Sequence, residues 1–221
     1  MVQFLQLMQL SDSAVPIGGA AHSLGLEGLA EWREVEANSL ELLIQSFLHE
    51  QGLLEACFCR ASYAAGEQRE QVVSLGRMLS AQKLAKESRD ASVVLGRRLL
   101  ALCSSILPSE TRGALSSAFQ NADTHHAIVF GYVGALLKFD VEQTAAAFLH
   151  QSVSALVSAA QRLMPVGQKQ AVNALWLMKE ELVNVVKESG TRNYRSVGSF
   201  MPLMEVASMR HPRLETRLFL S

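Results

Sequence analysis

Apolar residues recur with helical spacing along most of the chain. Asp140 with Gln143 is typical of a capping box and starts one such stripe. Its members are Val141, Ala145, Phe148, Leu149, Leu156, Ala160 and Leu163. A second stripe contains Val172, Leu175, Trp176, Leu182, Val183 and Val186. We expect it to be one helix, with Lys187 in the last turn and Gly190 as the stop.

Earlier segments follow the same period. Asn38 and Glu41 are expected to cap a helix that runs to about Tyr63, and residues 71–107 one or two helices ended by Pro108. Asp123 is expected to cap a helix that continues to Lys138. No run alternates with period two between turns, so a sheet is not expected. The pattern predicts one all-α domain over residues 1–221, a bundle of about seven to nine helices. Only residues 10–27 and 191–221 break it.

Composition excludes several classes of protein. The 221 residues are 49% hydrophobic and 19% charged, with a formal charge of −1. This balance fits neither a disordered chain nor a general nucleic-acid binder. No apolar run reaches the roughly 18 residues of a membrane span, and the N-terminus lacks the pattern of a signal peptide. Three cysteines without a signal predict reduced thiols in a cytoplasmic protein.

Charge is uneven along the chain. The stretch from Glu27 to Glu55 carries seven acids and only Arg33 as a base. Residues 67–98 carry seven bases and four acids, and the tail from 191 carries five arginines and two acids. These blocks are read either as solvated helix faces or as complementary patches that orient partners.

Most short motifs of catalysis are missing from the sequence. There is no phosphate-binding G-x-x-x-x-G-K-[ST] loop, no G-x-G-x-x-G and no G-x-S-x-G. Cys57 and Cys59, two apart on a helix, and His125 and His126, adjacent on another, diverge too far to chelate a metal and are expected to be packing residues. Gly131 and Gly134 fall inside a predicted helix and indicate close approach of a second helix.

The turn-rich segment near the N-terminus is harder to explain by packing alone. Gly18 and Gly19 follow Pro16 and allow a positive φ or close approach of another chain. His22, Ser23 and Glu27 lie at the following helix start, with Ser23 and Glu27 on one face. Two interpretations stay open, a Ser–His–Glu nucleophile system and an ordered loop presented to a partner.

Four stretches of the chain, in order, resemble the UreF family of urease accessory proteins. The first, residues 7–27, reads LMQLSDSAVPIGGAAHSLGLE, and the second combines ESRDAS at 87–92 with GRRLL at 96–100. The third is 126–131 followed by AQRLMPVGQ at 160–168, and the fourth is PLMEVASMRH at 202–211 with the ending RLFLS. The chain departs from the family pattern at Ala20, usually aromatic, after Gln168, where a second Gly-Gln is missing, and at Leu220, usually arginine.

The resemblance implies an all-helical, dimeric maturation factor that is not an enzyme. Such proteins bind the accessory protein UreD (also called UreH) and recruit the GTPase UreG, and the assembly delivers nickel to apo-urease. The resemblance implies no catalytic residue, no tightly bound cofactor and no metal ligands in the chain itself, with nickel handled by the assembly. Its partner-binding or signature positions are Pro16, Gly18, Gly19, His22, Ser23, Gly25, Glu27, Arg89, Gln168, Arg210, His211 and Arg217.

Three roles remain open at this level. A scaffold would use the amphipathic tail, residues 199–221, as a segment ordered by UreD, and loss of residues 210–221 should then abolish UreD binding while the core stays folded. A regulator of the UreG GTPase could supply an arginine, with Arg89 and Arg217 as candidates. A nickel-binding chaperone could use His22, His211, Cys57 or Cys59.

Overall fold

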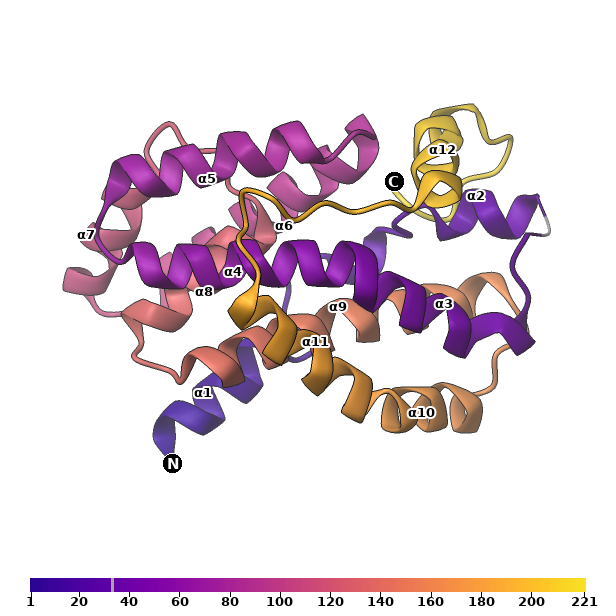
Figure 1. Cartoon of the computed structure of the whole chain (residues 1–221), viewed down its shortest axis with the longest axis horizontal. Coiled ribbons are helices and arrows are strands. Elements are labelled where there is room, and N and C mark those ends of the chain that lie inside the picture. Colours follow the sequence, from indigo (N-terminus) through magenta and orange to yellow (C-terminus); the bar gives the residue numbers. More distant parts are fainter. Residues whose placement is uncertain (33) are drawn as a thin grey trace.

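The computed structural model describes residues 1–32 and 34–221 and shows them as helices and connecting loops without a strand. The all-α class is therefore confirmed (Figure 1). The α-helices are α1 (Val2–Leu10), α2 (Leu26–Glu31), α3 (Leu40–Phe47), α4 (Leu53–Ala65), α5 (Arg69–Gln82), α6 (Lys86–Ile106), α7 (Ser109–Ala118), α8 (His126–Leu136), α9 (Val141–Leu163), α10 (Gln168–Leu177), α11 (Lys179–Thr191) and α12 (Pro202–Arg210). These helices outnumber the seven to nine expected, because α2, α7 and α12 are short elements inside segments that the sequence left as loops or joined to neighbours.

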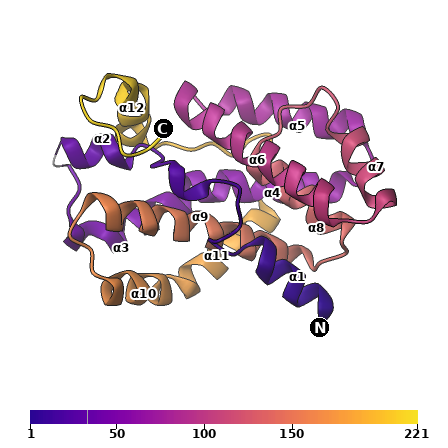
Figure 2. The same cartoon turned by 180° about the vertical axis from the view of Figure 1, so that it is seen from behind.

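Helix α4 forms the centre of the molecule. It packs against α8 on one side and against α5, α9 and α11 around it, and Figures 1 and 2 show these helices on its front and back. A π-helical turn, Leu48–Gly52, joins α3 to α4 into one nearly continuous rod. Gly131 permits the contact with α8, because a Cβ there would meet the backbone carbonyl of Cys59. The expected close approach at Gly131 is thus confirmed.

The first turns of the helices show which of the predicted capping residues are used. The Asp140 carboxylate accepts the backbone N–H of Gln143 at 2.9 Å, as predicted for α9. Before α3, however, a 3-10 turn over Ala37–Ser39 is capped reciprocally by Glu36 and Ser39, and α3 itself has no side-chain cap, so the expected cap by Asn38 with Glu41 is wrong. The expected cap of α8 by Asp123 is also wrong, since its carboxylate instead accepts the Ser80 hydroxyl at 2.7 Å.

The expected helix over 172–190 is two helices. The chain breaks at Met178, so α10 and α11 turn different faces inward, and Val172, Trp176 and Val183 are exposed. Gly190 lies one residue before the end of α11 at Thr191, close to the predicted stop and beside the guanidinium of Arg60.

The C-terminal segment crosses the molecule before it ends. From α11 it runs over the front of α4 to α12, which lies against α2, as the yellow trace in Figure 1 shows. This path brings the N-terminal and C-terminal signatures, which are far apart in sequence, close together.

No helix in the described part of the chain is long and apolar enough to cross a membrane.

Candidate functional site

A segment near the start of the chain binds the last residues of the chain. The Ser221 carbonyl oxygen accepts the Ser23 backbone N–H at 2.6 Å and the Ser23 hydroxyl at 3.0 Å. Next to it, the Leu220 N–H donates to the Ala21 carbonyl at 2.8 Å. We call residues 18–27 together with residues 204–221 the terminal junction. The tail is therefore ordered against its own chain, where the sequence had suggested ordering by a partner.

Glu27 lies at the centre of the terminal junction. One carboxylate oxygen contacts His211 Nε2 at 2.7 Å and the other accepts the Leu218 N–H at 2.6 Å. Glu27 is 5% exposed and His211 1% exposed. A buried carboxylate needs such partners, because an unpaired one would be costly to desolvate. Glu27 thus fixes both α12 and the last residues on α2.

His22 and Ser23 are also committed to the C-terminal segment. His22 Nδ1 lies 2.7 Å from the Ser221 hydroxyl oxygen. Burial lowers the pKa of His22, and the charges of Arg98 and His211 lower it further, so the imidazole is neutral at pH 7. Because the Ser23 hydroxyl donates to a backbone carbonyl and not to His22, the residues do not form the hydrogen-bonded relay that a Ser–His–Glu nucleophile needs.

Two signature glycines are required by geometry. Gly25 has φ +91°, and a Cβ there would lie 2.6 Å from the Met204 carbonyl oxygen. Gly18 has φ +84° and lies beside Arg98, which donates to the Ile17 carbonyl at 3.3 Å. A side chain at Gly25 would therefore separate α12 from α2.

Arg162 completes the terminal junction, although the sequence did not single it out. Its guanidinium donates to the Ala20 carbonyl at 2.6 Å and the Leu218 carbonyl at 3.3 Å, and lies 4.2 Å from the centre of the Phe219 ring. The signal was its place in the stretch RLMPVGQ, which the resemblance had already marked. Arg162 thus links α9 to the N-terminal loop and to the C-terminal segment.

Other predicted site residues lie outside these contacts or at their edge. Arg89 donates to the Lys83 carbonyl at 2.9 Å at the start of α6, and Gln168 accepts the Gln161 amide at 2.9 Å at the start of α10. Arg210 lies 5.6 Å from the Trp32 ring centre, whereas Arg217 is exposed. Of the remaining two, Pro16 lies in the loop that precedes the terminal junction, and Gly19 lies in the terminal junction near its first residue.

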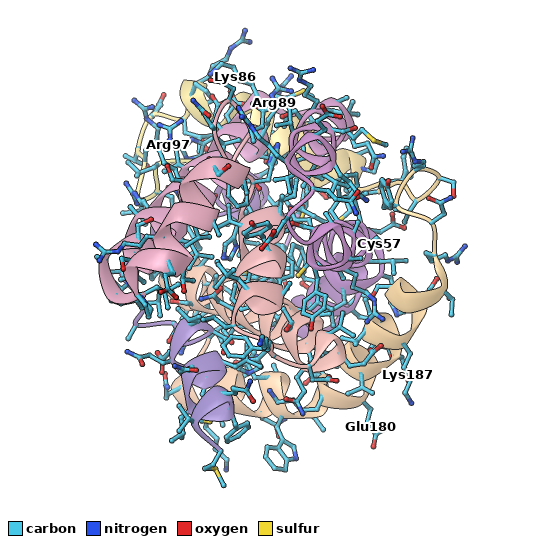
Figure 3. The ribbon with its side chains drawn as sticks, turned by 90° about the vertical axis from the view of Figure 1, so that its left-hand side faces the viewer. Cys57, Lys86, Arg89, Arg97, Glu180 and Lys187 are labelled. Atoms are coloured by element: carbon cyan, nitrogen blue, oxygen red, sulfur yellow. The ribbon has the colours of Figure 1, made fainter. Side chains whose placement is uncertain are left out.

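The acidic stretch is used partly inside the molecule. Glu27 and Glu55 are buried, and Glu50 accepts the Phe200 N–H at 2.6 Å. Glu31 on α2, Glu41 on α3, and Glu34 and Glu36 in the segment between these helices stay exposed. Arg33, the single base of this stretch, lies outside the described residues. Figure 3 shows bases of α6, among them Lys86 and Arg97, on the opposite side from Glu180 and Lys187 of α11.

The candidate nickel ligands are not gathered. Cys57 and Cys59 are buried in α4, and burial raises the pKa of their thiols to about 11 and about 12, so both are protonated at pH 7. His211 is already engaged by Glu27. Among the described residues, no group of three or more histidine, cysteine and acidic side chains is placed to hold a metal ion.

Comparison with known proteins decides the family. Residues 35–179 match the UreF family profile. A urease accessory protein UreF from Bacillus sp. (strain TB-90) is 33% identical over 227 aligned residues that cover all of both chains. The chain belongs to the UreF family. Another UreF, from Geobacillus kaustophilus, is 30% identical over 99% of this chain and 98% of its own, and one from Actinobacillus pleuropneumoniae is 28% identical over all of both.

Proposed function

We propose that this chain is a urease accessory protein that is not itself an enzyme. It would act in the cytoplasm as a homodimeric scaffold that joins UreD and the GTPase UreG for GTP-dependent insertion of nickel into apo-urease. The observation that carries this proposal is similarity over the full length to proteins named urease accessory protein UreF. Nickel is then the cargo of the assembly.

The terminal junction is the surface we assign to UreD. Glu27 and Arg162 hold the backbone of Leu218, and Ala21 and Ser23 hold that of Leu220 and Ser221, while the side chains of Leu218 and Leu220 remain 60% and 68% exposed. Arg217 beside them adds an exposed guanidinium. Exposed apolar side chains with an arginine, fixed before binding, lose little conformational entropy on docking and suit a protein partner.

The test of the scaffold role uses the whole chain with its proposed partners. It is co-expressed with UreD, UreG and urease, purified through a tag on UreD, and the mass of the complex is measured by light scattering. We expect a complex that contains this chain in two copies, and nickel-loaded active urease only when the chain is present. Failure to co-purify with UreD, or full urease activation without the chain, would overturn the proposal.

A matched pair of arginine variants tests the assigned surface. Arg217→Ala should weaken UreD binding about tenfold, the loss of roughly one exposed interface anchor. Arg112→Ala, on exposed α7 at the far end of the molecule, is the control and should bind as the parent does (Figure 1). Equal affinities for both variants would place the UreD surface elsewhere.

A further inference from the structure

A cavity of about 200 Å³ lies beneath the N-terminal loop and borders the terminal junction, with which it shares Gly19, Ala20, His22 and Leu24. Its mouth is formed by the exposed Asp12, Ser13 and Ala20. Its floor is formed by the buried ion pair of Glu55 and Lys83, together with His126. It therefore reaches from the surface to the centre of the helical packing.

Three buried polar atoms on its wall lack a hydrogen bond of good geometry, although the side chains of His126 and Gln151 lie close enough to interact with each other. They are His22 Nε2, His126 Nε2 and Gln151 Oε1, on side chains that are only 5–7% exposed. The orientation of Gln151 is fixed, because its amide nitrogen donates to the carbonyls of Leu10 and Asp12 at 3.2 and 3.4 Å. Buried polar groups are nearly always hydrogen-bonded, so three that meet in one cavity indicate a bound molecule.

Charge on the wall argues against an ion. Glu55 is neutralised by Lys83, with a further hydrogen bond from Gln51 at 3.3 Å. Both imidazoles are neutral at pH 7, since burial lowers the pKa of His22 and brings that of His126 to about 4. Apart from Asp12 at the exposed mouth, the charges of the lining cancel, so an ion in the interior would lose its hydration without a counter-charge there.

The lining of the cavity is mixed in polarity. Ser154 and Ser158, one turn apart on α9, contribute polar groups to the lining, while Ile17, Leu24 and Phe47 contribute apolar ones. The volume equals that of about seven water molecules, and several of these would lie against hydrocarbon without a partner. A molecule with one hydrogen-bonding end and one apolar end satisfies both kinds of lining group.

We propose that the cavity lined by His22, His126 and Gln151 binds a small uncharged molecule, a primary carboxamide or an alcohol on a short apolar group. Gln151 Oε1 only accepts, so the ligand must donate there. Imidazole nitrogens and serine hydroxyls match the remaining donors and acceptors of such a group. This inference does not rest on the proposed role in urease maturation.

The experiment uses benzamide as the probe and benzoate as its charged isostere. Each is titrated into the full chain labelled at histidine, and the ring signals of His126 and His22 are followed by NMR. We expect benzamide to shift both signals with a dissociation constant of about 1 mM or below, and benzoate to bind at least tenfold more weakly. A crystal grown with benzamide should show its amide nitrogen on Gln151 Oε1.

Variants that fill the cavity provide the control. Ala155→Leu adds three carbon atoms to its wall on α9 and should weaken benzamide binding at least tenfold, with circular dichroism checking the fold. Ser158→Val is a smaller change with the same expected direction. Unshifted histidine signals, equal binding of benzoate, unchanged binding by both variants, or a crystal with only water in the cavity would each overturn the proposal.

Discussion

At the residue scale, Glu27 shows how one side chain can hold several elements. One of its oxygens contacts His211 in a buried position, and the other accepts the N–H of Leu218 in a partly buried one. Removing the carboxylate leaves a buried imidazole and a backbone donor without partners, which costs more than the pair itself contributes. Glu27 therefore affects stability as strongly as a large core residue would.

Glu27→Ala should lower the free energy of unfolding by roughly 3 kcal/mol, because the buried partners are left unsatisfied. Urea unfolding followed by circular dichroism measures the change. Glu31→Ala, at the exposed end of the same helix, is the matched control and should stay within about 0.5 kcal/mol of the parent. A loss below about 1 kcal/mol for Glu27→Ala would contradict this account.

Two buried histidines predict a pH dependence of stability. Burial, together with the nearby charge of Lys83, lowers the pKa of His125 and of His126 to about 4. In the unfolded chain the pKa of both imidazoles is about 6.5. Below that pH the unfolded chain binds protons that the folded chain does not. The free energy of unfolding should then fall until about pH 4, by up to about 1.4 kcal/mol per pH unit for each imidazole.

Urea unfolding between pH 7 and pH 4.5 measures this slope. His126→Gln removes one of the two groups and should reduce the slope by the contribution of one imidazole, because His125 keeps its bonds to Ser80 and Ser92. A variant slope identical to that of the parent would show that His126 is not the group responsible.

At the element scale, the contact of α4 with α8 decides the packing of the centre. Gly131→Ala places a Cβ against the Cys59 backbone carbonyl, which cannot move without shifting α4, and should destabilise the protein by roughly 2 kcal/mol or more. Gly113→Ala lies inside α7 with open space around it and should stabilise by roughly 0.5–1 kcal/mol. Thermal unfolding compares the two, and changes of the same sign would contradict the interpretation.

Elements with a local cause could be predicted from the sequence. The Asp140 cap and the glycine contact at Gly131 depend on neighbouring residues or on one surface of a helix. The break at Met178 could not be predicted, because the apolar positions on both sides of it continue a single helical period and only tertiary packing separates them. Tertiary packing also explains why the predicted cap of α8 by Asp123 is wrong, since the Asp123 carboxylate accepts the hydroxyl of Ser80 on another helix.

At the scale of the whole molecule, the terminal junction joins residues that no local rule relates. The resemblance marked Glu27 and His211 as signature positions but did not indicate that they meet, since spacing carries no information across 184 residues. The sequence pattern does not mark Arg162 as a contact residue, because a single arginine in a helix most often lies in solvent. The cavity was equally invisible, because its wall is drawn from the N-terminal loop and several helices.

Deleting residues 214–221 tests the terminal junction directly. The deletion removes the partners of Ser23 and one partner of Glu27, so residues 20–27 should exchange amide hydrogens faster while α4 and α8 keep their protection. Hydrogen exchange with mass spectrometry locates the effect. Unchanged exchange at residues 20–27 would show that the C-terminal contacts do not stabilise this segment.

The pairing of Glu27 with residues 184 and 191 positions later also sets an order of events at the ribosome. Synthesis at about 5–20 residues per second separates these residues by roughly ten to forty seconds. Throughout that interval residues 22–27 of the nascent chain carry a carboxylate, an imidazole and a serine whose bonding partners have not yet been made. The N-terminal signature is thus the first part translated and among the last to reach its final bonds, and chaperones have the longest access to it.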